Sequence, residues 1–417
     1  MNIFVRSASW LALEKGMRVA SGILVTASIA RYLGPDSYGV LSVVMGTLAV
    51  FAAGAAMGAD HINTAELSTR NLWSSMQFLS SALLARLLWS LACLVGLVIF
   101  VFYDDRSHAQ LYLIGALIIP ASALGIFANK IQADGEFSLY AKLSCAAMLL
   151  GAVVKLMGVF KEYDLAYFAA ASVFDAVATV VLLGYWVYAG STVPATELLP
   201  KWRAARAYIN LCAPTAIAAI LVALYLRLEL FMVNSLLNGT STGLWAGVVM
   251  FLAPWRMVAS SVMVIANRHI AQSGINIESY DEKIVKLIRF MLLVSLVCVL
   301  LNTLLAKAVV PLLLGDKYFE ISGVIGIVSL TLIPLFMGAV QDVWIAHQRT
   351  TSIVLKKVVI GLPLSFGILY FFIITYGLNG AAYGMVFSYF TTAVGLNLFY
   401  DRRFLVLQLR SIGVKHD

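Results

Sequence analysis

Charged residues are scarce in this 417-residue chain: Asp, Glu, Lys and Arg make up 12%, against roughly a quarter of an average soluble domain. Hydrophobic residues make up 61%, and the mean hydropathy is +0.91. This balance excludes a water-soluble globular protein. The apolar runs are long enough for about twelve bilayer crossings of about 20 residues each, which leaves no room for a sizeable soluble catalytic domain.

Features typical of soluble enzymes and metal sites are also missing from the sequence. The four cysteines lie in separate apolar runs without paired spacing, so we expect neither a disulfide framework nor a metal site. The sequence contains no glycine-rich phosphate loop, no His-Glu-x-x-His helix and no Gly-x-Ser-x-Gly nucleophile elbow. We therefore expect that the protein is not an enzyme, with no catalytic residue and no cofactor.

The long apolar runs predict an all-α integral membrane protein. Backbone groups in hydrocarbon must be hydrogen-bonded within their own segment, and these runs exceed the roughly ten residues of a membrane β-strand. About twelve transmembrane helices are expected, at residues 8–31, 38–59, 76–102, 109–131, 139–160, 165–189, 208–234, 243–266, 285–309, 322–346, 353–375 and 378–400.

The distribution of positive charge predicts the topology. Most Lys and Arg residues lie in the terminal tails and the even-numbered loops, which places both termini in the cytoplasm. Lys plus Arg exceeds Asp plus Glu by 29 to 21, and in a membrane protein this excess indicates orientation rather than a nucleic-acid partner. The first apolar run contains Glu14, Lys15 and Arg18, which a cleavable signal peptide would not carry, so we expect it to remain as the first helix.

The chain is predicted to consist of two parallel six-helix repeats around a central cavity, residues 1–200 and 201–417. The longest connection, residues 190–207, lies on the inner side between them. Residues of the two halves match at offsets that rise along the chain: Leu33, Ser37, Gly39 and Val44 with Leu237, Ser241, Gly243 and Val248; Leu165, Ala169, Val173, Phe174, Thr179 and Val181 with Leu378, Ala382, Val386, Phe387, Thr392 and Val394; and Pro120 with Pro334. An even number of helices per half relates the repeats by an axis along the membrane normal.

Six cations and three carboxylates fall well inside the predicted helices: Lys15, Arg18, Arg86, Lys155, Arg227, Arg256, Glu14, Asp175 and Glu229. A central Arg, Lys or Asp costs about 2.5 to 3.5 kcal/mol, so we expect these residues to face one another or a hydrated cavity. The excess of cations predicts an electropositive lumen for an anion, because an Arg guanidinium can bond two phosphate oxygens at once. The expected substrate-binding residues are Arg18, Arg86, Lys155, Arg227 and Arg256.

The carboxylates Glu14, Asp175 and Glu229 are candidates for ion coupling. A carboxylate in a low dielectric can bind and release a proton or can partner a sodium ion. Two simpler interpretations stay open at this point. Some of the cations, namely Lys15, Arg86 and Lys155, could extend to the lipid headgroups instead, and Glu14 with Arg18 could form a static ion pair within one helix.

Two hairpins carry a family resemblance. The segment from Ala30 to Ser42, ARYLGPDSYGVLS, resembles the first outer hairpin of the Wzx-type polysaccharide and O-antigen repeat-unit flippases, a branch of the multidrug/oligosaccharidyl-lipid/polysaccharide exporter superfamily. The stretch from Glu229 to Trp245 is similar to that family's hairpin between the seventh and eighth helices, where Asp and Tyr are expected in place of these two residues. Chain length and the six-plus-six organisation agree with the family.

The resemblance implies a flippase that moves undecaprenyl-pyrophosphate-linked oligosaccharide repeat units, as for O-antigen lipopolysaccharide, across the bacterial cytoplasmic (inner) membrane. Movement from the inner to the outer leaflet would occur by alternating access with ion antiport. The implied partners are a proton or sodium ion, membrane lipids, a polysaccharide polymerase and a chain-length regulator. Three alternatives compete: a multidrug or organic-cation exporter of the same fold, a polysaccharide polymerase or ligase, and a structural scaffold. A polymerase or ligase would be expected to carry a long outer loop, whereas the outer loops predicted here span only a few residues.

Overall fold

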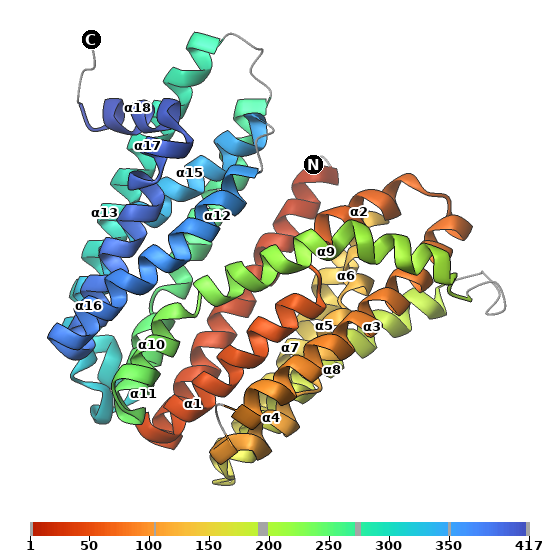
Figure 1. Cartoon of the computed structure of the whole chain (residues 1–417), viewed down its shortest axis with the longest axis horizontal. Coiled ribbons are helices and arrows are strands. Elements are labelled where there is room, and N and C mark those ends of the chain that lie inside the picture. Colours follow the sequence, from red (N-terminus) through yellow and green to blue (C-terminus); the bar gives the residue numbers. More distant parts are fainter. Residues whose placement is uncertain (1–2, 104–105, 191–198, 272–276, 349–351, 414–417) are drawn as a thin grey trace. The chain divides into compact units, whose positions relative to one another are not determined.

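The computed structural model describes residues 3–103, 106–190, 199–271, 277–348 and 352–413, and every regular element within these ranges is helical (Figure 1). The predicted all-α class is confirmed. Ten helical stretches of the described chain are long and apolar enough to cross a membrane. Two of them, Leu13–Thr69 and Leu355–Tyr400, are long enough for two crossings of about 20 residues each. The chain is therefore a multi-pass membrane protein with about twelve crossings. Of the predicted connection at 190–207, residues 191–198 lie outside the described ranges.

Two compact units divide the chain, and each takes in segments from both halves of the sequence. Unit 1 contains Met1–Tyr32 and Val40–Arg227, and unit 2 contains Leu33–Gly39 and Leu228–Asp417. The first outer hairpin thus packs with the second half, and the start of the seventh crossing packs with the first half. The division into residues 1–200 and 201–417 refers to the sequence repeats and stays a prediction.

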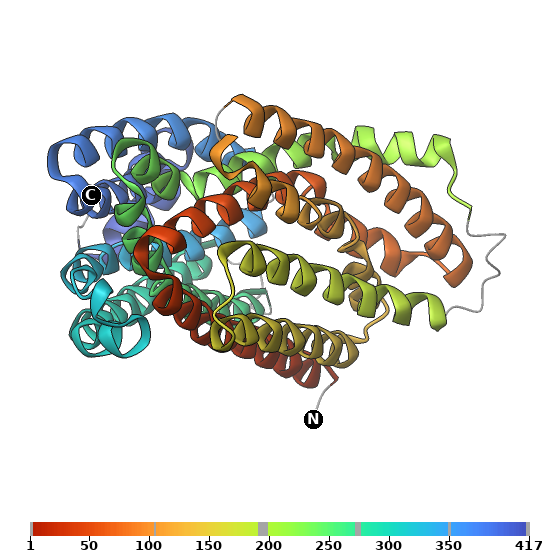
Figure 2. The same cartoon turned by 90° about the horizontal axis from the view of Figure 1, so that it is seen from below.

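Unit 1 is a helical bundle in which α7 and α8 run side by side (Figure 2). Its elements are α1 (Ile3–Ala55, except the hairpin), α2 (Asp60–Thr69), α3 (Leu72–Tyr103), the 3-10 turn η1 (Arg106–His108), α4 (Ala109–Gly115), α5 (Ile118–Ala123), α6 (Ile126–Ala133), α7 (Phe137–Phe160), α8 (Leu165–Ala189) and α9 (Trp202–Tyr225). Two crossings within α1 are joined at Gly34, whose φ of 73° suits a residue without a Cβ atom. Pro35 follows, in a position where its missing N–H is not needed.

Unit 2 is a second helical bundle, and its α16 also contains two crossings, joined at Gly377 with φ 59°. Its elements are α10 (Leu228–Leu236), α11 (Gly239–Met250), α12 (Ala253–Ala271), α13 (Ile277–Leu314), the 3-10 turn η3 (Asp316–Tyr318), α14 (Ile321–Ser329), α15 (Leu332–Gln348), α16 (Ser352–Phe390), the π-helical turn η4 (Thr391–Gly395), α17 (Asn397–Tyr400) and α18 (Arg402–Ser411). The amphipathic α18 was not predicted; it buries Phe404 and Leu407 and packs on α13 and α15.

Several crossings predicted as single helices are interrupted. The fourth crossing bends at Ala116 and the tenth at Leu330, in each case four residues before a proline. Proline has no N–H to donate to the carbonyl at that position and its ring crowds that carbonyl, so the helix breaks there. Each broken crossing follows a 3-10 turn, η1 or η3, which agrees with the predicted repeat. The seventh crossing is divided between α9 and α10, and the eighth between α11 and α12.

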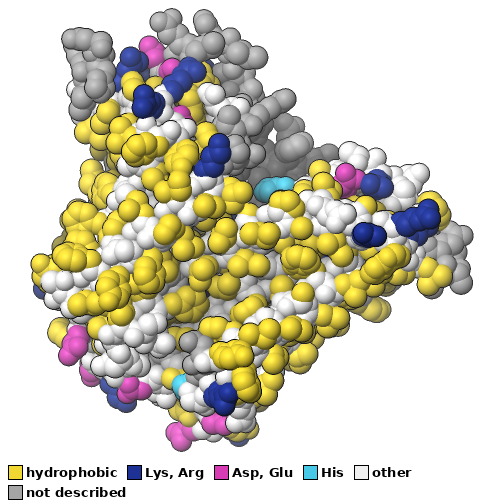
Figure 3. Space-filling model, in the orientation of Figure 1, with side chains coloured by type: hydrophobic (Ala, Val, Ile, Leu, Met, Phe, Trp, Pro, Cys, Tyr) yellow, Lys and Arg dark blue, Asp and Glu magenta, His cyan; other side chains and the backbone are white. Residues whose placement is uncertain are grey.

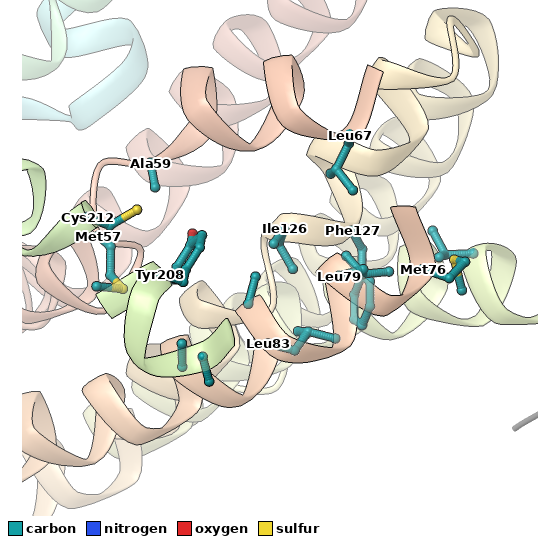
Figure 4. Close-up of a cluster of buried hydrophobic side chains, with 14 of the residues drawn as sticks. Met57, Ala59, Leu67, Met76, Leu79, Leu83, Ile126, Phe127, Tyr208 and Cys212 are labelled. Atoms are coloured by element: carbon teal, nitrogen blue, oxygen red, sulfur yellow. The ribbon is translucent and has the colours of Figure 1, made fainter. Parts of the chain in front are cut away.

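The core of unit 1 is a cluster of buried apolar side chains from α2, α3, α6, α8 and α9 and from the link before α2 (Figure 4). Met57, Leu79 and Ile126 are completely buried in it. On the outside, apolar side chains cover most of the face seen in Figure 3, whereas charged side chains lie toward the helix ends. Lipid tails are as apolar as these side chains, so the exterior is suited to a bilayer.

Candidate functional site

The first charged cluster of unit 1 joins α1 to α7. Arg18 Nε and Nη2 donate to Glu14 Oε1 at 2.9 and 2.6 Å, and Nη2 also donates to Ser144 Oγ at 2.6 Å. The Ser144 hydroxyl in turn donates to Glu14 Oε1 at 3.2 Å. Glu14 is buried, whereas 51% of the Arg18 side chain is exposed. The ion pair that the spacing indicated is present, and Ser144 extends it to a second helix, which the sequence did not indicate.

Ser144→Ala is expected to lower the free energy of unfolding by about 1 kcal/mol, because the hydroxyl both accepts from Arg18 and donates to Glu14. Thermal unfolding of the purified protein in detergent measures the effect. Ser28→Ala is a matched control, since the Ser28 hydroxyl donates to Leu24 O of its own helix. Equal effects of the two substitutions would contradict the role of Ser144.

The second charged cluster joins α7 to α8. Lys155 Nζ lies 2.6 Å from Asp175 Oδ2. Asp175 fits closely against Gly151, one turn before Lys155, because a Cβ atom at Gly151 would lie only 2.6 Å from Asp175 Oδ1. Arg18 also interacts electrostatically with Asp175. Charges of alternating sign therefore extend across α1, α7 and α8 and sum to zero, so each cation of this network has a carboxylate that competes with an anion for it.

Arg86 lies apart from both ion pairs, in the apolar core of unit 1. Its side chain is 1% exposed, and Nη2 donates to Ser122 O at the end of α5, at 3.2 Å. This arginine was expected to face a hydrated lumen or the headgroups. The structure places it among the buried side chains of α3 instead.

The remaining predicted site residues lie on separate elements. Arg256 Nη2 donates to the Tyr389 hydroxyl at 3.1 Å, which joins α12 to α16 within unit 2. Glu229 is buried in the first turn of α10, and Arg227 is exposed at the break between α9 and α10. Lys15 is exposed on α1. The sequence did not indicate Tyr389 as the partner of Arg256, because 133 residues separate them.

Unit 2 also contains a buried amide network that the sequence did not indicate. Lys357 Nζ donates to Gln341 Oε1 at 2.7 Å, and Gln341 Nε2 donates to Asn397 Oδ1 at 2.7 Å. Asn397 Nδ2 then donates to Gln408 Oε1 of α18 at 3.0 Å. The network fixes α18 against α15, α16 and α17. Its partners are far apart in sequence, so no helical periodicity would reveal it.

The two hairpins that carried the family resemblance are in direct contact within unit 2. A Cβ atom at Gly39 would lie 2.5 Å from Gly239 O, and one at Gly243 would lie 1.8 Å from Pro35 O. The Thr240 hydroxyl donates to Asp36 Oδ1. Both positions therefore require glycine, because the backbones touch.

This contact has a reciprocal geometry. Gly243 and Gly239 follow Gly39 and Pro35 at the repeat offset of 204, and Thr240 follows Asp36 at the same offset. Gly39 lies against Gly239 O, and Gly243 lies against Pro35 O. Each glycine therefore contacts the equivalent carbonyl of the other repeat. Reciprocal contacts of this kind are typical of a two-fold interface, here between two repeats of one chain.

A family model described as polysaccharide biosynthesis protein matches residues 4–267. The chain belongs to this polysaccharide biosynthesis protein family. No curated protein sequence matches it.

The solved structures similar to this chain include transporters and a flippase. The lipid II flippase MurJ in an inward closed conformation has a TM-score of 0.75 at 14% identity, over 99% of this chain and 91% of MurJ. An inward-facing multidrug resistance MATE family transporter of the MOP superfamily has a TM-score of 0.71 at 16% identity, over 95% of both chains. A MOP superfamily transporter from Pyrococcus furiosus, described as having a binding pocket of reverse polarity, has a TM-score of 0.63 at 15% identity, over 96% of both chains. These TM-scores show that the chain has the same fold as these proteins.

Proposed function

We propose that the protein is a flippase for undecaprenyl-pyrophosphate-linked oligosaccharide repeat units. It moves them from the inner to the outer leaflet of the bacterial cytoplasmic membrane, with both termini in the cytoplasm, and delivers them to a polysaccharide polymerase and its chain-length regulator. The observation that supports this most is the family match over residues 4–267, in a chain with the fold of a lipid flippase. The hairpins that touch through Gly39 and Gly243 carry the Wzx-type resemblance.

Arg18, Arg227 and Arg256 are proposed to bind the pyrophosphate group, and Lys155 joins them when Asp175 is displaced. Arg86, which was also predicted for this role, is buried in the core of unit 1 and is not part of the proposed site. Arg18 is the best placed of them in unit 1, because half of its side chain is exposed while its carboxylate partner is buried. A pyrophosphate oxygen that replaces Glu14 on the guanidinium would keep the cation paired.

Ion coupling follows from the same competition. Once the substrate displaces Glu14 from Arg18, this buried carboxylate has lost its counter-charge and can bind a proton or a sodium ion. Release of the ion restores the pair with Arg18 and favours release of the substrate. In this scheme the ion and the substrate bind together, so the coupling is symport and differs from the antiport that the family resemblance implies. Asp175, paired with Lys155, and Glu229 of α10 are the other candidates.

The test uses a strain with the gene deleted and complemented by wild-type or variant protein. Deletion should remove surface polysaccharide and leave the lipid-linked oligosaccharide on the inner leaflet, protected in intact spheroplasts from a membrane-impermeant sugar-oxidising reagent. Arg18→Ala, Arg227→Ala and Arg256→Ala should each reduce export at least tenfold at normal membrane levels. Arg106→Ala is the matched control, because this exposed arginine packs over Phe102 outside the proposed site. Full export by all three site variants would refute the cationic site.

A multidrug exporter of the same fold is the second candidate, favoured by the similarity to the MATE family transporter. It makes a different prediction for the same deletion strain. Loss of the gene would then raise the sensitivity of cells to cationic dyes and leave surface polysaccharide unchanged. The flippase proposal predicts the reverse.

A further inference from the structure

Unsatisfied hydrogen-bond donors are concentrated around Arg86 in unit 1. Arg86 Nε, Arg86 Nη1 and Asn63 Nδ2 are buried and have no hydrogen-bond partner. Arg86 is 1% exposed, and Asn63 is completely buried. These nitrogen atoms can donate but cannot accept. A buried donor without an acceptor costs about 1–3 kcal/mol, so several at one place indicate that an acceptor belongs there.

Tyr208 connects the two residues. Its hydroxyl donates to Asn63 Oδ1 at 2.9 Å, and it also interacts with Arg86. Since the amide oxygen of Asn63 is engaged in this way, its Nδ2 group is the end that remains to donate. Three elements, α2, α3 and α9, therefore direct polar groups to one place inside the bundle.

The charge of Arg86 is not neutralised by an ion pair within the described part of the chain. Asp60, an exposed residue of α2, acts on it only through longer-range electrostatics. The neighbouring polar groups are uncharged: Ser122 O accepts from Nη2, and the Tyr208 hydroxyl and the Cys212 thiol also act on Arg86. Leu83 and Ile126, in the same cluster as Tyr208, are apolar (Figure 4). An uncompensated charge in such a place costs several kcal/mol, whereas Lys155 of the same unit has its carboxylate at 2.6 Å.

We propose that Arg86 and Asn63 bind one small monovalent inorganic anion, with chloride the most abundant ion of this class. A single negative charge neutralises the guanidinium, and the Arg86 Nε, Arg86 Nη1 and Asn63 Nδ2 groups supply the donors. Apolar walls suit a weakly hydrated sphere better than phosphate, whose oxygens need more donors. Tyr208 positions the Asn63 amide and does not bind the ion, because its proton is given to Asn63 Oδ1. The ion would stabilise the packing of α2 on α3, and this structural role does not depend on the proposed transport.

Thermal unfolding of the purified full-length protein tests the site. The protein is compared in sodium chloride, sodium bromide and sodium gluconate at equal ionic strength. Because a ligand that binds only the folded state stabilises it, chloride and bromide should raise Tm by a few degrees with saturation, and gluconate, a bulky polyhydroxy carboxylate and not a small inorganic anion, should not. Equal Tm values in the three salts would overturn the proposal.

Two variants separate this site from general salt effects. Asn63→Asp keeps the acceptor for Tyr208 and places a carboxylate beside Arg86, so it should fold in gluconate and lose the halide dependence. Arg70→Met removes an exposed arginine that pairs with Glu66 and should keep the full halide response. A full response in the Asn63→Asp protein would overturn the proposal. In crystals grown with bromide, an anomalous peak beside the Arg86 guanidinium would support it, and an ordered water there without such a peak would refute it.

Discussion

Gly243→Ala is expected to reduce surface polysaccharide export to the level of the deletion strain and to lower Tm by several degrees. The added Cβ atom would lie 1.8 Å from Pro35 O and 2.9 Å from Pro35 Cα, and backbone atoms cannot turn aside as a side chain can. Relief requires that the hairpin Leu33–Gly39 moves away from α11, at a cost above the roughly 1–3 kcal/mol typical of overpacking. Export is measured by complementation, and stability by thermal unfolding in detergent.

The reciprocal geometry supplies a second variant, and the chain offers a matched control. Gly39→Ala should show the same kind of loss, since its Cβ atom would lie 2.5 Å from Gly239 O. Gly338→Ala, in α15 of the same unit, adds a Cβ atom with no neighbour within 4 Å and should be neutral or stabilising by up to about 1 kcal/mol. Wild-type stability and export in the Gly243→Ala protein would show that the hairpins do not dock in this way.

Removal of either partner of the Lys155–Asp175 pair should lower the free energy of unfolding by about 1–3 kcal/mol. Lys155→Met leaves a carboxylate without its cation, and Asp175→Asn leaves an ammonium group without its anion. Breaking a fully buried pair costs about 3–5 kcal/mol, and these side chains are 18% and 32% exposed, so a smaller loss is expected. Thermal unfolding of the two single variants measures it.

The double variant distinguishes stability from ion coupling. Lys155→Met with Asp175→Asn removes both charges together, so most of the stability should return, and a double-mutant cycle gives the coupling energy. If Asp175 binds the coupled ion, this stable protein should still lose transport driven by an ion gradient. Normal gradient-driven export by the double variant would exclude Asp175 from coupling. Strictly additive losses in the cycle would show that the two side chains do not interact.

Much of the fold could be predicted from the sequence, because every segment that crosses the hydrocarbon of a membrane must satisfy its own backbone hydrogen bonds and therefore forms a helix. The predicted helix at 165–189 agrees with α8 at both ends. The interruption at Leu226–Arg227 could not be predicted, since no proline lies nearby in the following turn and each side of the break is apolar. The amphipathic α18, with only ten residues, is too short to cross a membrane, so its hydropathy gives no signal for it.

Contacts in the candidate site could be predicted only where both residues lie on the same helix. Glu14 and Arg18 lie four residues apart, so their pairing follows from helical geometry. Lys155 and Asp175 lie on different helices. Their contact depends on how α7 packs on α8, where Gly151 has no Cβ atom and leaves room for the Asp175 side chain. Arg86 was expected in a lumen or at the lipid headgroups, but helix α3 is apolar on most of its surface, so the sequence contains no signal for the face that packs inward.

The exchange of segments between the two units has a consequence for synthesis on the ribosome. The hairpin Leu33–Gly39 is made about 200 residues before its docking partner around Gly243. At a synthesis rate of about 5–20 residues per second, roughly 10 to 40 s pass between the synthesis of this hairpin and that of its partner. During this time Gly39 lacks its contact with Gly239. Unit 1 is likewise incomplete until α9 has been inserted. Unit 2 therefore combines one of the earliest segments of the chain with the last ones to be made, and it cannot be completed before α11 has been inserted.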